Sequence, residues 1–104
     1  MTRLTITTAD TPTGPVVGVA GDLDHATADQ LRTTVTALPL RPGQRLVLDL
    51  AGLAFCDSSG LTALLAARNH ATAAQAEITL SAVPDRTLRM IRLIGLDRVF
   101  PLQP

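Results

Sequence analysis

The sequence predicts one α/β domain in which helices pack against a mixed, mostly parallel sheet of four or five strands. Strand-like segments alternate with segments of helical periodicity in the order β-β-α-β-α-β-α, followed by a short final strand. A turn-rich break separates the first two strands, which indicates a hairpin. With 104 residues, the chain suits a single domain over 1–104, with its core at about 4–100.

The hairpin is predicted from residues 4–8 and 16–20. Residues 4–8 alternate between polar and apolar side chains, as expected of a strand with one exposed face. Residues 11–15 (Thr-Pro-Thr-Gly-Pro) are rich in turn formers. We therefore expect 16–20 to pair antiparallel with 4–8, and a loop at 21–25 to lead into the first helix.

The first helix is predicted to start at Thr27. Thr27 and Gln30 have the spacing of a capping box, in which side chains satisfy the backbone N–H groups at the helix start. Leu31, Val35 and Leu38 recur at helical spacing and are expected to face the core. Prolines that follow soon afterwards end the helix.

The middle of the chain is predicted to form a strand, a helix and another strand. Residues 45–50 are almost wholly apolar, so a parallel strand that is buried on both faces is expected. An alanine- and leucine-rich segment predicts a second helix from about 59 to 76. Residues 78–82 form the next predicted strand.

The C-terminal part is predicted to form a third helix and a short strand. The Pro-Asp pair at 84–85 opens the helix, and Gly95 closes it. A last strand is expected around 99–100. Three residues of the third helix are expected to face inward: Leu88, Ile91 and Ile94.

Charge and composition argue against several classes of partner. Acidic and basic residues number nine each, so the formal net charge is zero. Nucleic acids and anionic membranes are bound by a basic excess, which this chain lacks. Hydrophobic residues make up 46% of the chain and aromatic residues only 2%, so the core is expected to be aliphatic. No apolar run suits a signal peptide or a membrane span, and a soluble, cytoplasmic protein is expected.

Cysteine and histidine give little support to a metal site. Cys56 is the only cysteine, which excludes an intramolecular disulfide and fits a reducing compartment. It ends an apolar segment, so burial is expected rather than reactivity. His25 and His70 match no usual zinc spacing. We therefore expect neither a metal nor a cofactor.

The most informative segment is Phe-Cys-Asp-Ser-Ser-Gly-Leu-Thr at 55–62. It places Asp57, Ser58, Ser59 and Gly60 where a strand ends and a helix begins. The first N–H groups of a helix lack internal partners and carry partial positive charge. A serine there is presented to solvent, and a phosphate on it meets a favourable field. The segment therefore suits a phosphorylation switch.

The predicted topology brings a second acidic segment to the same place. The strands at 16–20 and 45–50 are expected to be parallel, so the loops that follow them share one edge of the sheet. Sites in open α/β sheets form at that edge. Asp22 and Asp24 are therefore expected to lie on one small surface with residues 57–59.

Three segments together resemble a known family. They are Gly-Asp-Leu-Asp-His-Ala-Thr-Ala-Asp-Gln-Leu-Arg at 21–32, Leu-Val-Leu-Asp-Leu at 46–50 and Asp-Ser-Ser-Gly-Leu at 57–61. In this spacing the chain resembles a STAS-domain anti-sigma factor antagonist from about residue 4 to residue 100. The resemblance implies a STAS-type fold and a partner-switching regulator of bacterial transcription.

The resemblance also implies a phosphorylation cycle. The unphosphorylated protein would bind an anti-sigma factor that is also a serine kinase, and so free the sigma factor. The kinase, which holds ATP and magnesium, would phosphorylate Ser59 and end the complex, and a serine phosphatase would reset it. This chain would then be a phosphoacceptor and not an enzyme. The residues expected to contact the partner are Asp22, Asp24, Asp57, Ser58, Ser59, Gly60, Leu61 and Thr62.

The residues themselves leave the choice between the two serines open. If Ser58 is the helix N-cap, its hydroxyl accepts a backbone N–H and that of Ser59 is free. If Asp57 is the cap, both serines lie in the first turn. Only the resemblance selects Ser59.

Two alternatives remain at this point. Residues 56–60 superficially resemble the Gly-x-Ser-x-Gly elbow of hydrolases, but Cys56 replaces its first glycine. A hydrolase would need His25 within hydrogen-bond reach of Ser58 or Ser59. The other alternative is a non-catalytic STAS subunit of a larger lipid-transport or stress-sensing assembly.

Overall fold

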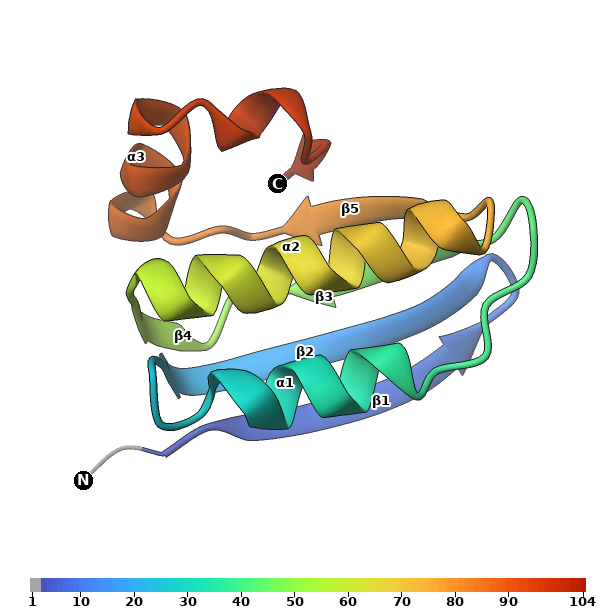
Figure 1. Cartoon of the computed structure of the whole chain (residues 1–104), viewed down its shortest axis with the longest axis horizontal. Coiled ribbons are helices and arrows are strands. Elements are labelled where there is room, and N and C mark those ends of the chain that lie inside the picture. The colour runs from blue at the N-terminus through green and yellow to red at the C-terminus, as the bar shows by residue number, and fades with distance from the viewer. Residues whose placement is uncertain (1–2) are drawn as a thin grey trace.

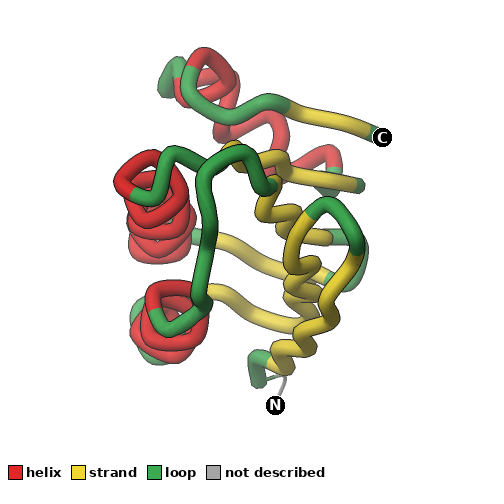
Figure 2. Tube along the Cα trace, turned by 90° about the vertical axis from the view of Figure 1, so that its right-hand side faces the viewer, coloured by secondary structure: helices red, strands yellow, loops and turns green. Residues whose placement is uncertain are grey.

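Helices α1 and α2 lie side by side over one face of a mixed sheet in the computed structural model, which describes residues 3–104 (Figures 1 and 2). Strands follow the order β1-β2-β3-β5-β6, and β4 pairs with β2 beside this path. Only the β1–β2 pair is antiparallel among these strands. Within these residues the elements are β1 (Thr5–Thr11), β2 (Gly14–Leu23), α1 (Ala28–Thr36), β3 (Arg45–Asp49), β4 (Leu53–Cys56), α2 (Ser58–Ala73), β5 (Glu77–Ser81), α3 (Asp85–Leu93), a 3₁₀ turn (Leu96–Arg98) and β6 (Leu102–Gln103).

The predicted α/β class, with its mixed and mostly parallel sheet, is confirmed, although the sheet has six strands. Helix α3 lies beyond β5 at the other side of the sheet from β1 (Figure 1). In residues 3–104, no helix combines the length and the apolar character that crossing a membrane requires.

The hairpin is confirmed but is longer than predicted. Thr11 pairs with Gly14 across a two-residue turn, so Gly14 and Pro15 belong to β2 and not to the turn. The Thr11 hydroxyl donates to the Gly14 carbonyl at 2.7 Å and closes this turn. At its other end β2 continues to Leu23, so the loop expected at 21–25 begins only after that residue.

Strand β4 was not predicted. The Leu53 N–H donates to the Leu50 carbonyl at 3.0 Å, and after this tight turn β4 continues along β2 in the same direction as β3. Asp22 pairs with Phe55 and Leu23 pairs with Cys56 in a parallel register. The segment before the Asp-Ser-Ser-Gly motif is therefore bonded directly to the strand that carries Asp22.

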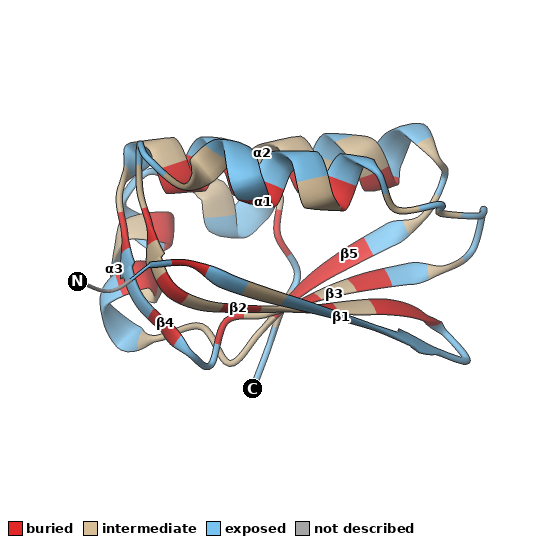
Figure 3. Ribbon diagram, turned by 90° about the horizontal axis from the view of Figure 1, so that it is seen from below, coloured by how far each residue is buried: buried red, intermediate tan, exposed pale blue. Residues whose placement is uncertain are grey.

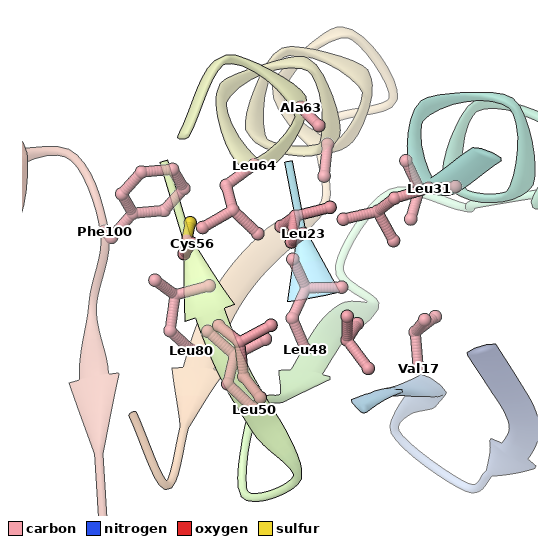
Figure 4. Packing of buried hydrophobic residues seen from close by; sticks show 14 of the residues in the cluster. Val17, Leu23, Leu31, Leu48, Leu50, Cys56, Ala63, Leu64, Leu80 and Phe100 are labelled. Carbon is pink, nitrogen blue, oxygen red and sulfur yellow. The ribbon is translucent and has the colours of Figure 1, made fainter. Parts of the chain in front are cut away.

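Burial of β3 on both faces is wrong. Leu46, Leu48 and Leu50 are fully buried, whereas Val47 and Asp49 are half-buried. The reason is visible in Figure 3, where α1 and α2 cover a single face of the sheet. The core is aliphatic, as expected, and lies between that face and the helices (Figure 4). Each fully buried leucine contributes roughly 1.5–3 kcal/mol relative to exposure.

Helix α1 starts without the predicted capping box. Thr27 makes no side-chain cap hydrogen bond, and the Gln30 amide instead donates to the Leu4 carbonyl at 3.3 Å. Leu31 and Val35 are fully buried, as predicted, while Leu38 lies past the helix end and is half-buried against the core.

The C-terminal predictions are confirmed in part. Ile91 is buried and Leu88 is half-buried, but Ile94 is 56% exposed because α3 ends at Leu93, before another inward turn forms. Gly95 has a φ of 79°, the left-handed conformation expected after a helix end. The final strand is Leu102–Gln103 and not 99–100, because Phe100 packs into the core instead.

Candidate functional site

The two motif segments meet at one edge of the sheet, as predicted from the parallel strands. The ends of β2 and β4 lie next to the first turns of α1 and α2 (Figure 1). The Asp57 N–H donates to the Leu23 carbonyl at 3.2 Å and ties the start of α2 to the end of β2. We call this edge, formed by residues 22–25 and 57–62, the switch edge.

Asp57 is the N-cap of α2, which resolves one alternative left by the sequence. Its backbone is extended, and its carboxylate accepts a hydrogen bond from the Gly60 N–H at 3.0 Å. Ser58 and Ser59 are therefore both in the first turn of the helix. Ser58 is exposed and Ser59 is half-buried. Among the hydrogen bonds found within residues 3–104, neither serine hydroxyl takes part.

Gly60 sets the distance between α2 and the sheet. A Cβ atom there would lie 2.5 Å from the Leu23 carbonyl oxygen and 2.7 Å from the Cys56 sulfur. Because a backbone oxygen cannot move aside cheaply, only glycine fits. Gly60 therefore allows α2 to approach the sheet closely. Gly60 and Leu61 are buried, whereas Thr62 is exposed.

The acidic loop at 22–25 is held by hydrogen bonds within itself. The Asp24 carboxylate accepts from the N–H groups of Ala26 at 2.9 Å and Thr27 at 3.2 Å. The Thr27 hydroxyl donates to the Asp22 carbonyl at 2.7 Å and accepts from the Asp24 N–H at 2.9 Å. Asp24 therefore shapes the turn from β2 into α1, whatever else it contacts.

Cys56, the residue before the motif, is buried, as predicted, and lies among the core side chains (Figure 4). Burial, with a smaller contribution from the neighbouring Asp57 carboxylate, raises the pKa of its thiol from 9.0 to about 12. Because the thiolate is the reactive form, this cysteine is inert near neutral pH.

A groove of about 220 Å³ runs between the first turns of α1 and α2. Sequence reasoning did not assign this feature. The α1 side carries an exposed ion pair between Arg32 and Asp29, and Ser59 lies on the α2 side. The lining residues are His25, Ala28, Asp29, Arg32, Ser59, Thr62 and Ala63. The i,i+3 spacing of Asp29 and Arg32 is visible in the sequence, but their position opposite Ser59 depends on how the helices pack.

The geometry gives no support to a hydrolase. His25 borders the same groove as Ser59, but no hydrogen bond joins it to either serine in the part of the chain that the structure describes. Neither serine therefore has the hydrogen-bonded base that an activated nucleophile requires. Within residues 3–104, His, Cys, Asp and Glu side chains nowhere gather into a group of three or more that could hold a metal ion.

Known proteins with similar sequences are named for one regulatory role. An anti-sigma-F factor antagonist of Mycobacterium tuberculosis, RsfB, is 31% identical over 95% of this chain and 80% of its own length. An anti-sigma F factor antagonist of Paenibacillus polymyxa is 31% identical over 84% of this chain and 75% of its own. These relatives support the role of an anti-sigma factor antagonist, which is a regulatory binding protein and not an enzyme.

Structure and family comparisons agree with this result. The crystal structure of an anti-sigma factor antagonist from Mycobacterium paratuberculosis superposes with a TM-score of 0.85 at 32% identity, over 98% of this chain and 86% of that one. The family model described as "Mlab, STAS domain" matches residues 6–104. The chain therefore belongs to the STAS domain family.

Proposed function

We propose that this chain is the antagonist in a partner switch, and that it binds an anti-sigma factor kinase through the switch edge while Ser59 is unphosphorylated. Phosphorylation of Ser59 then releases the partner. The observation that carries this proposal is the state of Ser59: its hydroxyl makes no hydrogen bond within residues 3–104, in a helix turn fixed by Asp57 and Gly60. The contact surface comprises Asp22, Asp24, Asp57, Ser58, Ser59 and Thr62, with Gly60 and Leu61 buried beneath them.

The choice of Ser59 over Ser58 has support from the groove. Ser58 is the more exposed of the two, so accessibility alone does not select Ser59. Ser59 faces the groove beside α1, which Ser58 does not line. A modification of Ser59 therefore changes the surface that both helices share, in addition to the first turn of α2.

A phosphate at this position opposes partner binding for electrostatic reasons. It adds about −1.5 to −2 charges at neutral pH. The helix N-terminus stabilises a negative charge by only about 0.3–1 kcal/mol at an exposed site. Burial of the dianion in an interface without a paired cation costs several kcal/mol, and the acids at 22, 24 and 57 share its edge. The interface cost is the larger quantity, so we expect release of the partner without unfolding.

The chemistry of transfer belongs to the partners in this proposal. The kinase supplies ATP and magnesium, and a serine phosphatase removes the phosphate. The chain itself contributes the acceptor hydroxyl and the binding surface.

Intact mass spectrometry after incubation with a candidate anti-sigma kinase and Mg-ATP tests the proposal. We expect a gain of one phosphate, placed on Ser59 by peptide sequencing, and no gain in Ser59→Ala. The matched control, Ser58→Ala, should still be phosphorylated. A chain that binds the kinase but gains no phosphate would contradict the switch and favour a structural STAS subunit.

A further inference from the structure

We propose that the groove between α1 and α2 is a binding site for the phosphate ester on Ser59, with Arg32 as its cation. This inference rests on the proposed function, because it concerns the modified form of the same serine. The groove is lined by Ser59 on one side and by Arg32, Asp29 and His25 on the other. A phosphate on Ser59 therefore meets a groove whose opposite side carries Arg32.

Arg32 uses only part of its hydrogen-bonding capacity within the described residues. Its Nη2 atom donates to the Asp29 carboxylate, and this is the one hydrogen bond of its guanidinium found within residues 3–104. A guanidinium has five N–H donors arranged as a fork that matches phosphate oxygens. Arg32 can therefore bind a phosphate without complete loss of its ion pair with Asp29.

The ion pair with Asp29 is a weak competitor. The side chains of Arg32 and Asp29 are 54% and 80% exposed. Exposed pairs of this kind contribute little to stability, because solvent screens both charges. A phosphate carries nearly twice the charge of a carboxylate and forms stronger, charge-assisted hydrogen bonds. We therefore expect Arg32 to form more of its hydrogen bonds with the phosphate than with Asp29.

The other charged groups near Ser59 determine how strongly a phosphate there is repelled. The Asp24 carboxylate accepts a hydrogen bond from the Ala26 N–H at 2.9 Å, and the Asp57 carboxylate accepts one from the Gly60 N–H at 3.0 Å. They and Asp22 repel a phosphate, as does Asp29 inside the groove. Arg32 is the cation that opposes that repulsion, and His25 also lines the groove with ring nitrogens that can form hydrogen bonds.

Capture in the groove gives the switch a specific off state. The phosphate lies on the chain's own surface, fills the space between the helices and occupies Arg32. The modified protein therefore keeps its fold while it loses a cation and an open groove at the switch edge. This also explains in physical terms why modification of Ser59 would differ from modification of its neighbour Ser58.

The test uses phosphoserine installed at position 59 during synthesis, so no kinase is involved. The second pKa of the phosphate is measured by ³¹P NMR titration of the folded protein. We expect this pKa to be lower in the wild-type background than in Arg32→Gln by roughly 0.5–1 unit, because a nearby cation favours the dianion. Asp29→Asn should lower it further, since the carboxylate no longer competes.

Three controls make the result specific. Arg41→Gln removes an exposed arginine that does not line the groove and should leave the pKa unchanged. Phosphoserine at position 58 should show no dependence on Arg32. Thermal unfolding followed by circular dichroism verifies that each variant is folded. Equal pKa values in wild type and Arg32→Gln, or the same dependence on Arg32 at position 58, would overturn the proposal. Either result leaves the kinase experiment on Ser59 unaffected.

Discussion

The carboxylate of Asp57 accepts a hydrogen bond from the Gly60 N–H at 3.0 Å, so the first and last residues of Asp-Ser-Ser-Gly are hydrogen-bonded to each other at the start of α2. Gly60 also lies against the Leu23 carbonyl, where a side chain would not fit. These two residues therefore have structural roles. The serines between them are the part of the motif whose hydroxyls remain unbonded within residues 3–104.

Ser59→Asp should weaken binding to the anti-sigma kinase by at least roughly tenfold, because it adds a negative charge to an edge that already carries Asp22, Asp24 and Asp57 and that must be desolvated at the interface. The thermal midpoint should remain nearly unchanged, since an acid in the first turn of a helix is favourable. Calorimetric titration and circular dichroism measure the two effects. Ser58→Asp places the same charge one residue away and should weaken binding less. Retained binding by Ser59→Asp, or its unfolding, would count against the switch.

Asp57→Ala should destabilise the fold by about 1 kcal/mol, because the Gly60 N–H loses its cap. For a domain of this size that corresponds to a fall of roughly 4–8 °C in the thermal midpoint. Asp57→Asn keeps an oxygen acceptor and should recover most of the loss. If the thermal midpoint falls equally in Asp57→Ala and Asp57→Asn, the negative charge of Asp57 matters more than its hydrogen bond.

Gly60→Ala should destabilise the protein by about 1–3 kcal/mol, the range typical of overpacked cores. The added methyl group would lie 2.5 Å from the Leu23 carbonyl oxygen, so α2 must move away from β2. Urea denaturation followed by circular dichroism measures the loss. Ser58→Ala, at an exposed position in the same turn, should change the stability by less than about 0.5 kcal/mol. Similar losses in the two variants would show that the close approach is not maintained in solution.

Local patterns were sufficient to predict the hairpin, the three helices and the parallel strands β3 and β5, because each is encoded by periodicity within one segment. Strand β4 was missed because it has four residues and follows β3 after a tight turn. The capping box at Thr27 failed for a different reason. The Thr27 hydroxyl bonds the Asp22 carbonyl and Gln30 reaches Leu4, so partners outside the helix replace the local ones.

The switch edge was predictable because the carboxyl ends of parallel strands meet at one edge of a sheet. That rule is independent of side-chain detail, and it brought the segment of Asp22 and Asp24 to the same edge of the sheet as the segment of Ser59. The groove was not predictable in the same way. It depends on the lateral packing of α1 against α2, which brings Arg32 opposite Ser59. Charge spacing within a single helix does not determine which neighbouring helix it faces.

Cys56 should make the stability fall between pH 9 and pH 12. In the unfolded chain the thiol ionises near its ordinary pKa of 9.0, whereas burial raises the pKa in the folded state to about 12. Above pH 9 the folded state therefore binds more protons than the unfolded state, and the free energy of unfolding decreases as the pH rises. Below pH 9 both states keep the proton, and Cys56 contributes no slope.

The composition makes this effect unusually easy to isolate. All nine basic side chains are Arg and the chain has no Tyr, so no other side chain titrates between pH 9 and 12. Urea unfolding under reducing conditions, followed by circular dichroism at a series of pH values, measures the slope. Cys56→Ala should be less stable than the wild type below pH 9, because the variant leaves a small cavity, but its stability should be nearly independent of pH between 9 and 12. A flat wild-type profile over this range would mean that the thiol ionises as easily in the folded state as in the unfolded state, and an equal slope in both proteins would mean that Cys56 does not cause it.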